Sequence, residues 1–325
     1  MTTLAPRVSV ILPVYDGAAS VERAVRSIQA QTFTDWELVI CDDGSRDDSF
    51  QICQALSEGD ERLRLLRNPE NRGLAATMNR LVQEAKGEFC AIQEQDDESI
   101  PERLQLEVEA MDRHPDAGVL SGVAVWRNRN GEVWAHFPWL LKTGGQYPTD
   151  RDELIQFLYV DQSKIANATA MIRRSLFTNH GLRYDEQARM AIDWQFFVDA
   201  AHRGPIVGIP AELVYMSRGS DRSSLTTRTP VRYTEARRCI RVLYERYRKD
   251  PASPIDRSLY RRAMAAQRVI EARRFGRVRG LGLLALALCY HPTSRRAWKT
   301  LREFGLHVAC RLGLADPVPG RAIRP

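Results

Sequence analysis

Acidic and amide side chains follow three apolar runs in the first hundred residues of the chain. Tyr15 and Asp16 follow the first run, Asp42 and Asp43 follow the second, and residues 94–97 (Glu-Gln-Asp-Asp) follow the third. Carboxylates gathered at one place repel each other unless a cation or a hydrogen-bond donor offsets their charge. Carboxylate oxygens are the ligands that Mg²⁺ and Mn²⁺ prefer, usually one or two of them together with substrate phosphates. The pattern therefore indicates a metal–diphosphate site.

Other phosphate and metal sites are not indicated. The chain has no Walker motif, and no Gly-x-Gly-x-x-Gly follows its first apolar run, so neither a P-loop nor a dinucleotide fold is expected. Its histidines lack the spacing of zinc ligands.

The elements that must position these side chains alternate between strand and helix patterns. Buried strands are predicted at residues 8–14, 36–41, 62–66 and 89–93, and helical spacing of apolar residues lies between and after them. Repeated alternation of this kind predicts a largely parallel sheet flanked by helices. Parallel sheets bind ligands at the carboxyl ends of their strands, so the three polar clusters are expected to share one edge.

The pattern changes after Asp116. Strands are predicted at residues 119–126 and 132–137, joined around Asn130-Gly131, and short strands are expected near Ile206 and Leu213. From Pro230 on, the chain reads as helices. We therefore predict a domain over residues 1–229, with halves of about 1–116 and 117–229, and a basic helical region over 230–325.

Four segments carry a resemblance to a known family: VSVILPVYDGAASVERAVRSIQAQTF, WELVICDDGSRDDS, NRGLAATMNRLVQEAKGEFCAIQEQDD and IPERL. In this order they closely resemble the family 2 glycosyltransferases, over roughly residues 7–226. The resemblance implies an A-type glycosyltransferase fold and an inverting enzyme. It also implies a nucleoside-diphosphate sugar as donor, a hydroxyl-bearing glycan or lipid-linked acceptor, and Mn²⁺ or Mg²⁺ as cofactor.

The resemblance also implies roles for individual residues. Asp193, in the segment AIDWQFF, matches the catalytic base, and Asp96 matches the metal-binding acid at the end of the Asp-x-Asp position, where Glu94 replaces the usual first Asp. The positions that match the nucleotide-binding set are Pro13, Tyr15, Asp16, Asp42, Asp43, Asn71, Gly73, Glu94, Gln95 and Arg218.

Sugar transfer by direct displacement requires one base that takes the proton of the acceptor hydroxyl. Asp193 is the candidate for this base, although Asp is also a favoured helix N-cap. Asp185 and Glu186 lie close in sequence and are alternative bases.

The charge of the chain is unevenly distributed. Residues 231–325 hold 22 Lys and Arg against 7 Asp and Glu, whereas residues 1–230 hold 25 against 34. The apolar stretch 281–290 is flanked by arginines but is shorter than the roughly 20 residues that span a bilayer. It fits either the headgroup region of an anionic membrane or a packing helix. No motif for specific nucleic-acid binding accompanies the charge.

The N-terminal residues lack the pattern of a signal peptide, and the six cysteines have no CxxC spacing. We therefore expect a cytoplasmic protein, peripheral on the inner face of the membrane. The leading hypothesis is an inverting transferase in the assembly of a surface polysaccharide or glycolipid. The alternative is a module of the same fold that binds nucleotide or glycan but has weakened catalysis. The aromatics Trp126, Trp134, Phe137 and Trp139 are expected either to stack on sugars or to form core and rim.

Overall fold

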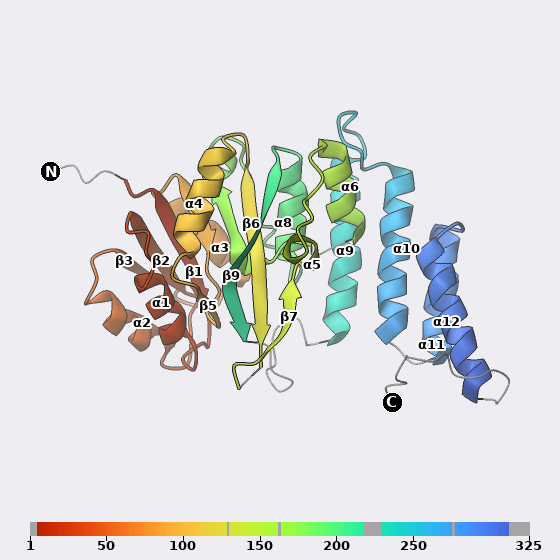
Figure 1. The fold of residues 1–325 in the computed structure, drawn as a ribbon, viewed down its shortest axis with the longest axis horizontal. Coiled ribbons are helices and arrows are strands. Elements are labelled where there is room, and N and C mark those ends of the chain that lie inside the picture. Colours follow the sequence, from red (N-terminus) through yellow and green to blue (C-terminus); the bar gives the residue numbers. More distant parts are fainter. Residues whose placement is uncertain (1–4, 129, 162–163, 218–228, 275–276, 312–325) are drawn as a thin grey trace. The chain divides into compact units, whose positions relative to one another are not determined.

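The computed structural model describes residues 5–128, 130–161, 164–217, 229–274 and 277–311 (Figure 1). The chain divides into two compact units. The first comprises residues 1–158 and 162–229, and the second comprises residues 159–161 and 230–325.

The first unit is built on a mixed sheet, nine-stranded over the described residues, with helices packed on it (Figure 1). Its strands are β1 (Val8–Val14), β2 (Trp36–Asp42), β3 (Leu63–Arg67), β4 (Phe89–Ile92), β5 (Asp97–Ser99), β6 (Val119–Arg127), β7 (Val133–Phe137), β8 (Ala170–Arg173) and β9 (Ile206–Ser217). Its helices are α1 (Val21–Gln29), α2 (Ser49–Ser57), α3 (Leu74–Glu84), α4 (Arg103–Arg113), α5 (Trp139–Lys142), α6 (Arg151–Asp161), whose last three residues belong to the second unit, the 3-10 turn η1 (Asn167–Thr169), α7 (Ser175–Thr178) and α8 (Ile192–Ala201).

The sheet order is β3-β2-β1-β4-β8-β6-β9-β5, with β7 paired to β6. The four strands β1 to β4 are parallel to one another, as the strand–helix alternation predicted. β8 is antiparallel to both β4 and β6, so β6 again points in the direction of β1. The carboxyl ends of β1, β2 and β4 therefore lie side by side at one edge of the sheet.

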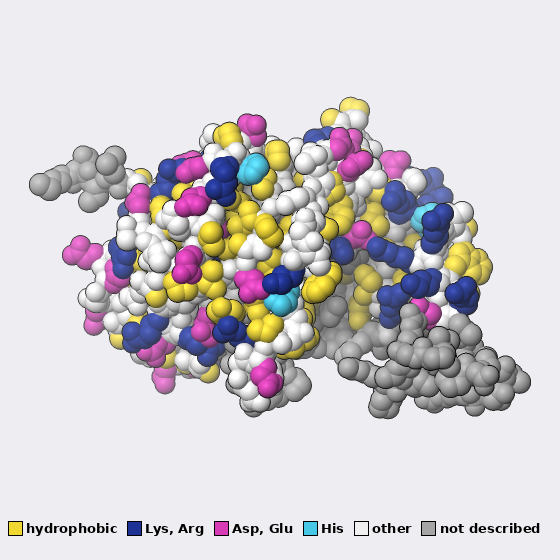
Figure 2. Space-filling model, viewed as in Figure 1, with side chains coloured by type: hydrophobic (Ala, Val, Ile, Leu, Met, Phe, Trp, Pro, Cys, Tyr) yellow, Lys and Arg dark blue, Asp and Glu magenta, His cyan; other side chains and the backbone are white. Residues whose placement is uncertain are grey.

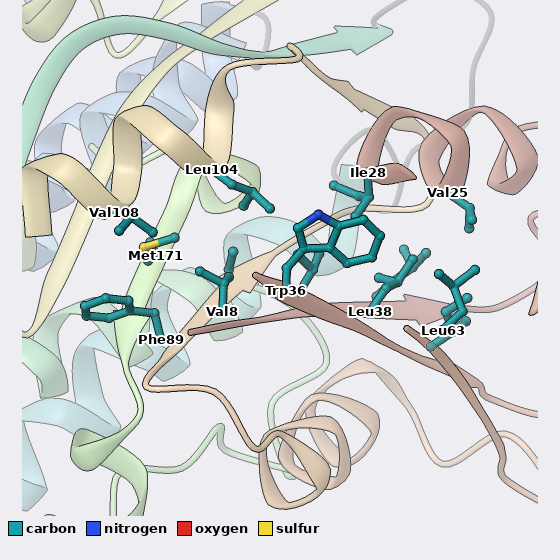
Figure 3. Close-up of a cluster of buried hydrophobic side chains, with 14 of the residues drawn as sticks. Val8, Val25, Ile28, Trp36, Leu38, Leu63, Phe89, Leu104, Val108 and Met171 are labelled. Carbon is teal, nitrogen blue, oxygen red and sulfur yellow. The ribbon is translucent and has the colours of Figure 1, made fainter. Parts of the chain in front are cut away.

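A buried hydrophobic cluster fixes these strands against α1 and α4 (Figure 3). Val8, Val10, Leu12 and Val14 alternate along β1 and point into this cluster, while Ile11, also fully buried, lies on the other face. Burial on both faces explains why β1 reads as a continuous apolar run rather than an alternating one. The strand ends are consequently held by a close-packed core.

After β4, the strands predicted from the sequence agree less well with the observed strands. The two short strands expected near Ile206 and Leu213 are wrong, because they form one continuous strand, β9, whose pairing with β6 is irregular near Ser121 and Val123. The predicted hairpin is present as β6 and β7. Asp150 caps α6, since its carboxylate accepts the backbone N–H of Glu153 at 2.9 Å.

The second unit contains α9 (Thr229–Tyr247), α10 (Arg257–Arg274), α11 (Arg277–Tyr290) and α12 (Arg295–Arg311). Side chains of α10, α11 and α12 form a hydrophobic cluster of their own. None of the helices in the described part of the chain is both long and apolar enough to cross a membrane.

Candidate active site

The ends of β1 and β4 are joined through the side chain of Gln95. The backbone N–H of Tyr15 donates to Gln95 Oε1 at 2.8 Å, and Gln95 Nε2 donates to the Tyr15 carbonyl at 3.1 Å. A Cβ atom at Gly17 would lie 2.5 Å from Gln95 Oε1, so this approach requires a glycine. Gln95, which the resemblance assigned to nucleotide binding, thus holds the loop after β1 against the turn after β4.

The loop after β1 is also tied to the loop after β2. Asp16 has a positive φ of 45°, its N–H donates to Ser45 Oγ at 3.1 Å, and its carboxylate accepts the backbone N–H of Arg46 at 2.9 Å. The guanidinium of Arg46 also binds this carboxylate and lowers the pKa of Asp16 below its usual value. Arg46 lies over the ring of Tyr15, 5.7 Å from its centre. Asp16 is therefore an ionised, partly exposed carboxylate that keeps two loops together.

The neighbouring carboxylates at the end of β2 differ in their hydrogen bonding. Asp43 accepts from Asn68 Nδ2 at 2.6 Å and from the backbone N–H groups of Arg72 and Gly73, both at 2.9 Å. Gly73 has a φ of 88°, in the left-handed region that favours glycine, and it immediately precedes α3. Asp43 therefore shapes the turn that contains Asn71, whose side chain is exposed.

Asp42, by contrast, retains one unused oxygen. Its carboxylate is fully buried, and Oδ1 accepts from the N–H of Ser45 at 3.2 Å and forms an ion pair with Arg67 Nε at 3.3 Å. Oδ2 has no hydrogen-bond partner among the described residues. A buried acceptor without a donor is costly. The arrangement is suited to a ligand that offers an N–H or O–H group at this point.

Because the two carboxylates differ in this way, replacing each by asparagine should affect a different property: nucleotide affinity for Asp42 and stability for Asp43. Asp42→Asn should weaken binding of a nucleoside diphosphate about 10- to 100-fold, because a hydrogen bond to a charged acceptor is worth about 1.5–3 kcal/mol, and should change the melting temperature little. Asp43→Asn should lower the melting temperature, since the amide keeps one acceptor oxygen and places an NH₂ donor against at least one of the three groups that donate to the carboxylate. Calorimetric titration and thermal melts of both variants measure the effects. Wild-type nucleotide affinity in Asp42→Asn would contradict the assignment.

An acidic cluster occupies the turn after β4. Glu94, Asp96 and Asp97 each offer a carboxylate oxygen, and these oxygens lie within 4.8 Å of one another. Glu94 and Asp96 are partly exposed, Asp97 is buried at the start of β5, and Glu94 also accepts from Asn167 Nδ2 at 3.0 Å. Oxygen-only ligands at this spacing fit Mg²⁺ or Mn²⁺. The set therefore fits the predicted cofactor, and it includes Asp97, to which the family resemblance assigned no role.

A buried network beneath the acidic turn was missed from the sequence. Gln93 Nε2 donates to the carbonyls of Glu94 and Asp97, at 3.0 and 2.8 Å. Gln93 Oε1 in turn accepts from Arg103 Nη1 at 3.2 Å, and Arg103 pairs with Glu107 at 3.0 Å. Arg103 and Glu107 are fully buried. Their spacing of four residues within the helix Arg103–Arg113 was the available signal. The network fixes the backbone of the acidic turn.

Asp193 lies in the first turn of α8, one residue after the helix begins, and its side chain is partly exposed. The alternative in which Asp193 caps the helix is wrong, because Ala191 holds the N-cap position, with a left-handed φ of 59°. Removal of water by the surrounding protein raises the pKa of Asp193 above its usual value, and the N–H groups of Trp194 and Asp193 oppose this only in part. A carboxylate with a raised pKa is a stronger base.

The alternative bases are engaged elsewhere. Glu186 accepts from Asn79 Nδ2 at 2.9 Å, and Asp185 accepts the backbone N–H of Gln187 at 3.0 Å. Asn79 also exchanges two hydrogen bonds with the backbone of Tyr184, at 3.0 and 2.9 Å. Since Asn79 belongs to α3, these bonds anchor the segment before α8 to the helix that starts at Gly73.

The structure thus brings most of the predicted residues together. At the carboxyl edge of the sheet, hydrogen bonds link Tyr15 to Gln95, Asp16 to the loop after β2, and Asp43 to Gly73. Five further predicted positions belong to the same strand ends and loops: Pro13, Asp42, Asn71, Glu94 and Asp96. Asp193 stands on a separate element, α8, and the hydrogen bonds of Asn79 anchor the segment before that helix to α3. Arg218 lies outside the described residues.

Known proteins resemble this chain in sequence and in fold. The succinoglycan biosynthesis protein ExoU of Rhizobium meliloti is 30% identical over 209 residues, which are 63% of this chain and 60% of ExoU. The Escherichia coli enzyme named UDP-Glc:alpha-D-GlcNAc-diphosphoundecaprenol beta-1,3-glucosyltransferase WfgD is 33% identical over 105 residues, 32% of this chain and 40% of WfgD. The matched regions thus span between two fifths and three fifths of these relatives.

Solved structures match over nearly the whole chain. Residues 1–349 of TarS from S. aureus, solved in complex with UDP-GlcNAc, have a TM-score of 0.59 at 18% identity and cover 97% of this chain and 95% of that one. The mannosyltransferase PcManGT of Pyrobaculum calidifontis, in complex with GDP-Man and Mn²⁺, has a TM-score of 0.54 at 19% identity, with 96% and 88% covered. These likenesses confirm the predicted A-type glycosyltransferase fold with C-terminal helices.

The model of one protein family, described as glycosyl transferase family 2, matches residues 9–181, which are more than half of the chain. This match includes all three strand-end clusters, and it confirms the family that the sequence motifs resemble. The chain belongs to glycosyl transferase family 2.

Proposed function

We propose that the protein is an inverting, metal-dependent glycosyltransferase that moves a sugar from a nucleoside diphosphate to a hydroxyl group. The observation that carries this proposal is that the acidic turn Glu94–Asp97 and the unpartnered oxygen of Asp42 both lie at the carboxyl ends of the parallel strands. The free oxygen of Asp42 suits the base of a nucleotide. The carboxylates of the turn suit a cation that carries a diphosphate.

Each group has a distinct task in the proposed reaction. Asp96, with Glu94 and Asp97 beside it, would hold Mn²⁺ or Mg²⁺, which as a Lewis acid stabilises the departing diphosphate. Arg218 is proposed to contact the same diphosphate. Asp193 takes the proton of the acceptor hydroxyl as that oxygen attacks the anomeric carbon. One carboxylate base is enough for a single displacement with inversion.

The names of relatives suggest the donor and acceptor classes. WfgD is named for UDP-glucose and a lipid diphosphate acceptor, and the TarS structure holds UDP-GlcNAc. We infer a uridine diphosphate sugar and a lipid-linked or polymeric glycan for this chain, in the assembly of a surface polysaccharide or glycolipid. The indole rings of Trp126 and Trp134 lie 4.9 Å apart on the β6–β7 hairpin, and Trp134 is 54% exposed. This exposed ring suits stacking on an acceptor sugar.

We also propose that three parts of the chain bind different partners. Residues 1–116 would bind the donor, residues 117–229 the acceptor, and the basic residues 230–325 an anionic membrane surface from the cytoplasmic side. If the acceptor is linked to a lipid, attachment to the membrane would place the enzyme close to it.

A panel of nucleotide sugars tests the proposed function. In the presence of Mn²⁺, one nucleoside diphosphate and its sugar should raise the melting temperature by several degrees, because a ligand at 100 times its Kd stabilises the native state by about 2.7 kcal/mol. The same sugar nucleotide should be turned over, with release of the nucleoside diphosphate. Binding without turnover would favour the weakened module instead, and a panel with no stabilising nucleotide would contradict both.

A further inference from the structure

Helix α11 is apolar on two opposite sides. Leu283, Leu284 and Ala287 are buried in the cluster that α11 forms with α10 and α12. On the other side, five residues are exposed to solvent: Leu281, Gly282, Ala285, Leu286 and Cys289. At 100° per residue these five cover an arc of about 140°. We call them the outer face of α11.

The outer face of α11 departs from what is usual for a surface helix. Such a helix places charged and polar side chains opposite its buried stripe, whereas residues 281–290 contain no charged residue. Leu281 is 43% exposed and Leu286 is 45% exposed. Exposed apolar stretches of this kind mark interaction sites.

The exposed side of α12 is cationic around a tryptophan. Arg295, Trp298, Lys299 and Arg302 are all exposed and recur at helical spacing, and Trp298 is 53% exposed. In the described part of the chain none of these three cations has a carboxylate partner, in contrast to Arg296, which pairs with Asp161. We call these four residues the cationic face of α12. Figure 2 shows dark blue side chains gathered over the C-terminal helices, with hydrophobic side chains at their margin.

The two faces belong to helices that pack against each other and are joined by residues 291–294. The indole N–H of Trp298 donates to the carbonyl of Pro292 at 2.8 Å, which holds the ring beside this connection. An apolar helix face next to unpaired cations and an interfacial tryptophan is typical of a surface that lies in the headgroup region of an anionic bilayer.

The positive charge of the cationic face of α12 favours a lipid surface over a second copy of the chain as the partner of these two faces. Two copies that met through these surfaces would bring the cations of both α12 helices together, and unpaired like charges disfavour such an interface. Anionic headgroups instead neutralise them. We propose that the outer face of α11 inserts among the headgroups of an anionic membrane, with α11 parallel to its plane, and that the cationic face of α12 binds lipid phosphates. This deepens the proposed membrane attachment, which it presupposes, by adding an apolar insertion to the electrostatic attraction.

Co-sedimentation of the full chain with vesicles tests the proposal. Phosphatidylcholine vesicles are compared with mixed phosphatidylcholine–phosphatidylglycerol vesicles. Leu281→Ser with Leu286→Ser should reduce partition onto the mixed vesicles by about tenfold or more, because the transfer of two half-exposed leucines is lost. Arg295→Gln, Lys299→Gln and Arg302→Gln together should reduce it about 100-fold at low salt, and wild-type partition should weaken as salt rises.

A charge-matched triple variant is the control. Lys249, Arg257 and Arg261 are exposed cations of the same unit outside both faces, and their replacement by Gln should reduce partition far less. An equal loss in this control would overturn the assignment to α12. The proposal is also overturned if the double leucine variant binds vesicles like the wild type, or if it instead dissociates a dimer in solution. Nucleotide binding, measured on every variant without vesicles, shows that the variants are folded and reports on the proposed function independently.

Discussion

Replacing Asp193 by asparagine is expected to lower kcat by about 10²- to 10⁴-fold, the range that a positioned general base contributes. Asparagine has nearly the same shape but cannot take the proton of the acceptor hydroxyl. Nucleotide affinity should stay close to the wild-type value, because the donor is proposed to bind at the strand ends rather than at α8. Steady-state kinetics with the donor found in the nucleotide panel, together with calorimetric titration of the nucleoside diphosphate, separate the two effects.

Two neighbouring carboxylates serve as controls. Asp185→Asn and Glu186→Gln remove charges from the segment just before α8, where each carboxylate already accepts a hydrogen bond within the protein. Their effect on kcat should be less than tenfold once stability is accounted for. If Asp193→Asn instead stays active and one of these controls loses about 10²-fold or more in kcat, the role of base belongs to that residue.

The raised pKa of Asp193 has two further consequences with opposite signs for activity and stability. The proposed base acts in its deprotonated form, so the acidic limb of the kcat/KM profile should lie above 3.8, the usual pKa of aspartate, and activity should fall as pH drops through it. Folding favours the protonated form of this group, so ionisation at neutral pH costs stability. Asp193→Asn should therefore melt at the wild-type temperature or higher. Residues needed for function often lower the stability of the folded protein in this way.

The parallel part of the fold could be predicted closely from sequence because β1, β2 and β4 are buried on both faces. Runs such as Val8–Val14 have no competing interpretation when helical spacing follows them. The positions of Asp42 and Asp96 at a shared edge then follow from the parallel topology alone. β9 could not be predicted as one strand, because its irregular pairing with β6 depends on the tertiary partner and not on local pattern.

The chemistry within the site was less predictable than its location. Asp42 and Asp43 are identical in type and adjacent, yet one shapes a turn and the other retains an unused oxygen, a difference that only the position of Asn68 and the 72–73 backbone decides. Similarly, Arg103 reads as an ordinary charged residue near a helix start. Its complete burial follows from the way α4 packs over Gln93, which the spacing of apolar residues does not reveal.

Asp96→Asn is expected to have the second large effect, a loss of about 10³-fold in kcat/KM, since a Lewis-acidic cation contributes several kcal/mol to the departure of a diphosphate. The buried Gln93–Arg103 network should keep the turn in place in this variant. Asp35→Asn is the matched control, because Asp35 is an exposed carboxylate that precedes β2 at the opposite edge of the sheet. It should retain wild-type activity.

We propose that the carboxylates after β4 bind a divalent cation that in turn binds the diphosphate of the donor. Calorimetric titration of the nucleoside diphosphate into wild type and Asp96→Asn, each with and without Mn²⁺, tests it most directly. Mn²⁺ should tighten nucleotide binding at least about tenfold in the wild type, and this gain should vanish in Asp96→Asn. Wild-type binding that is indifferent to Mn²⁺, or an equal gain in Asp96→Asn, would contradict the account.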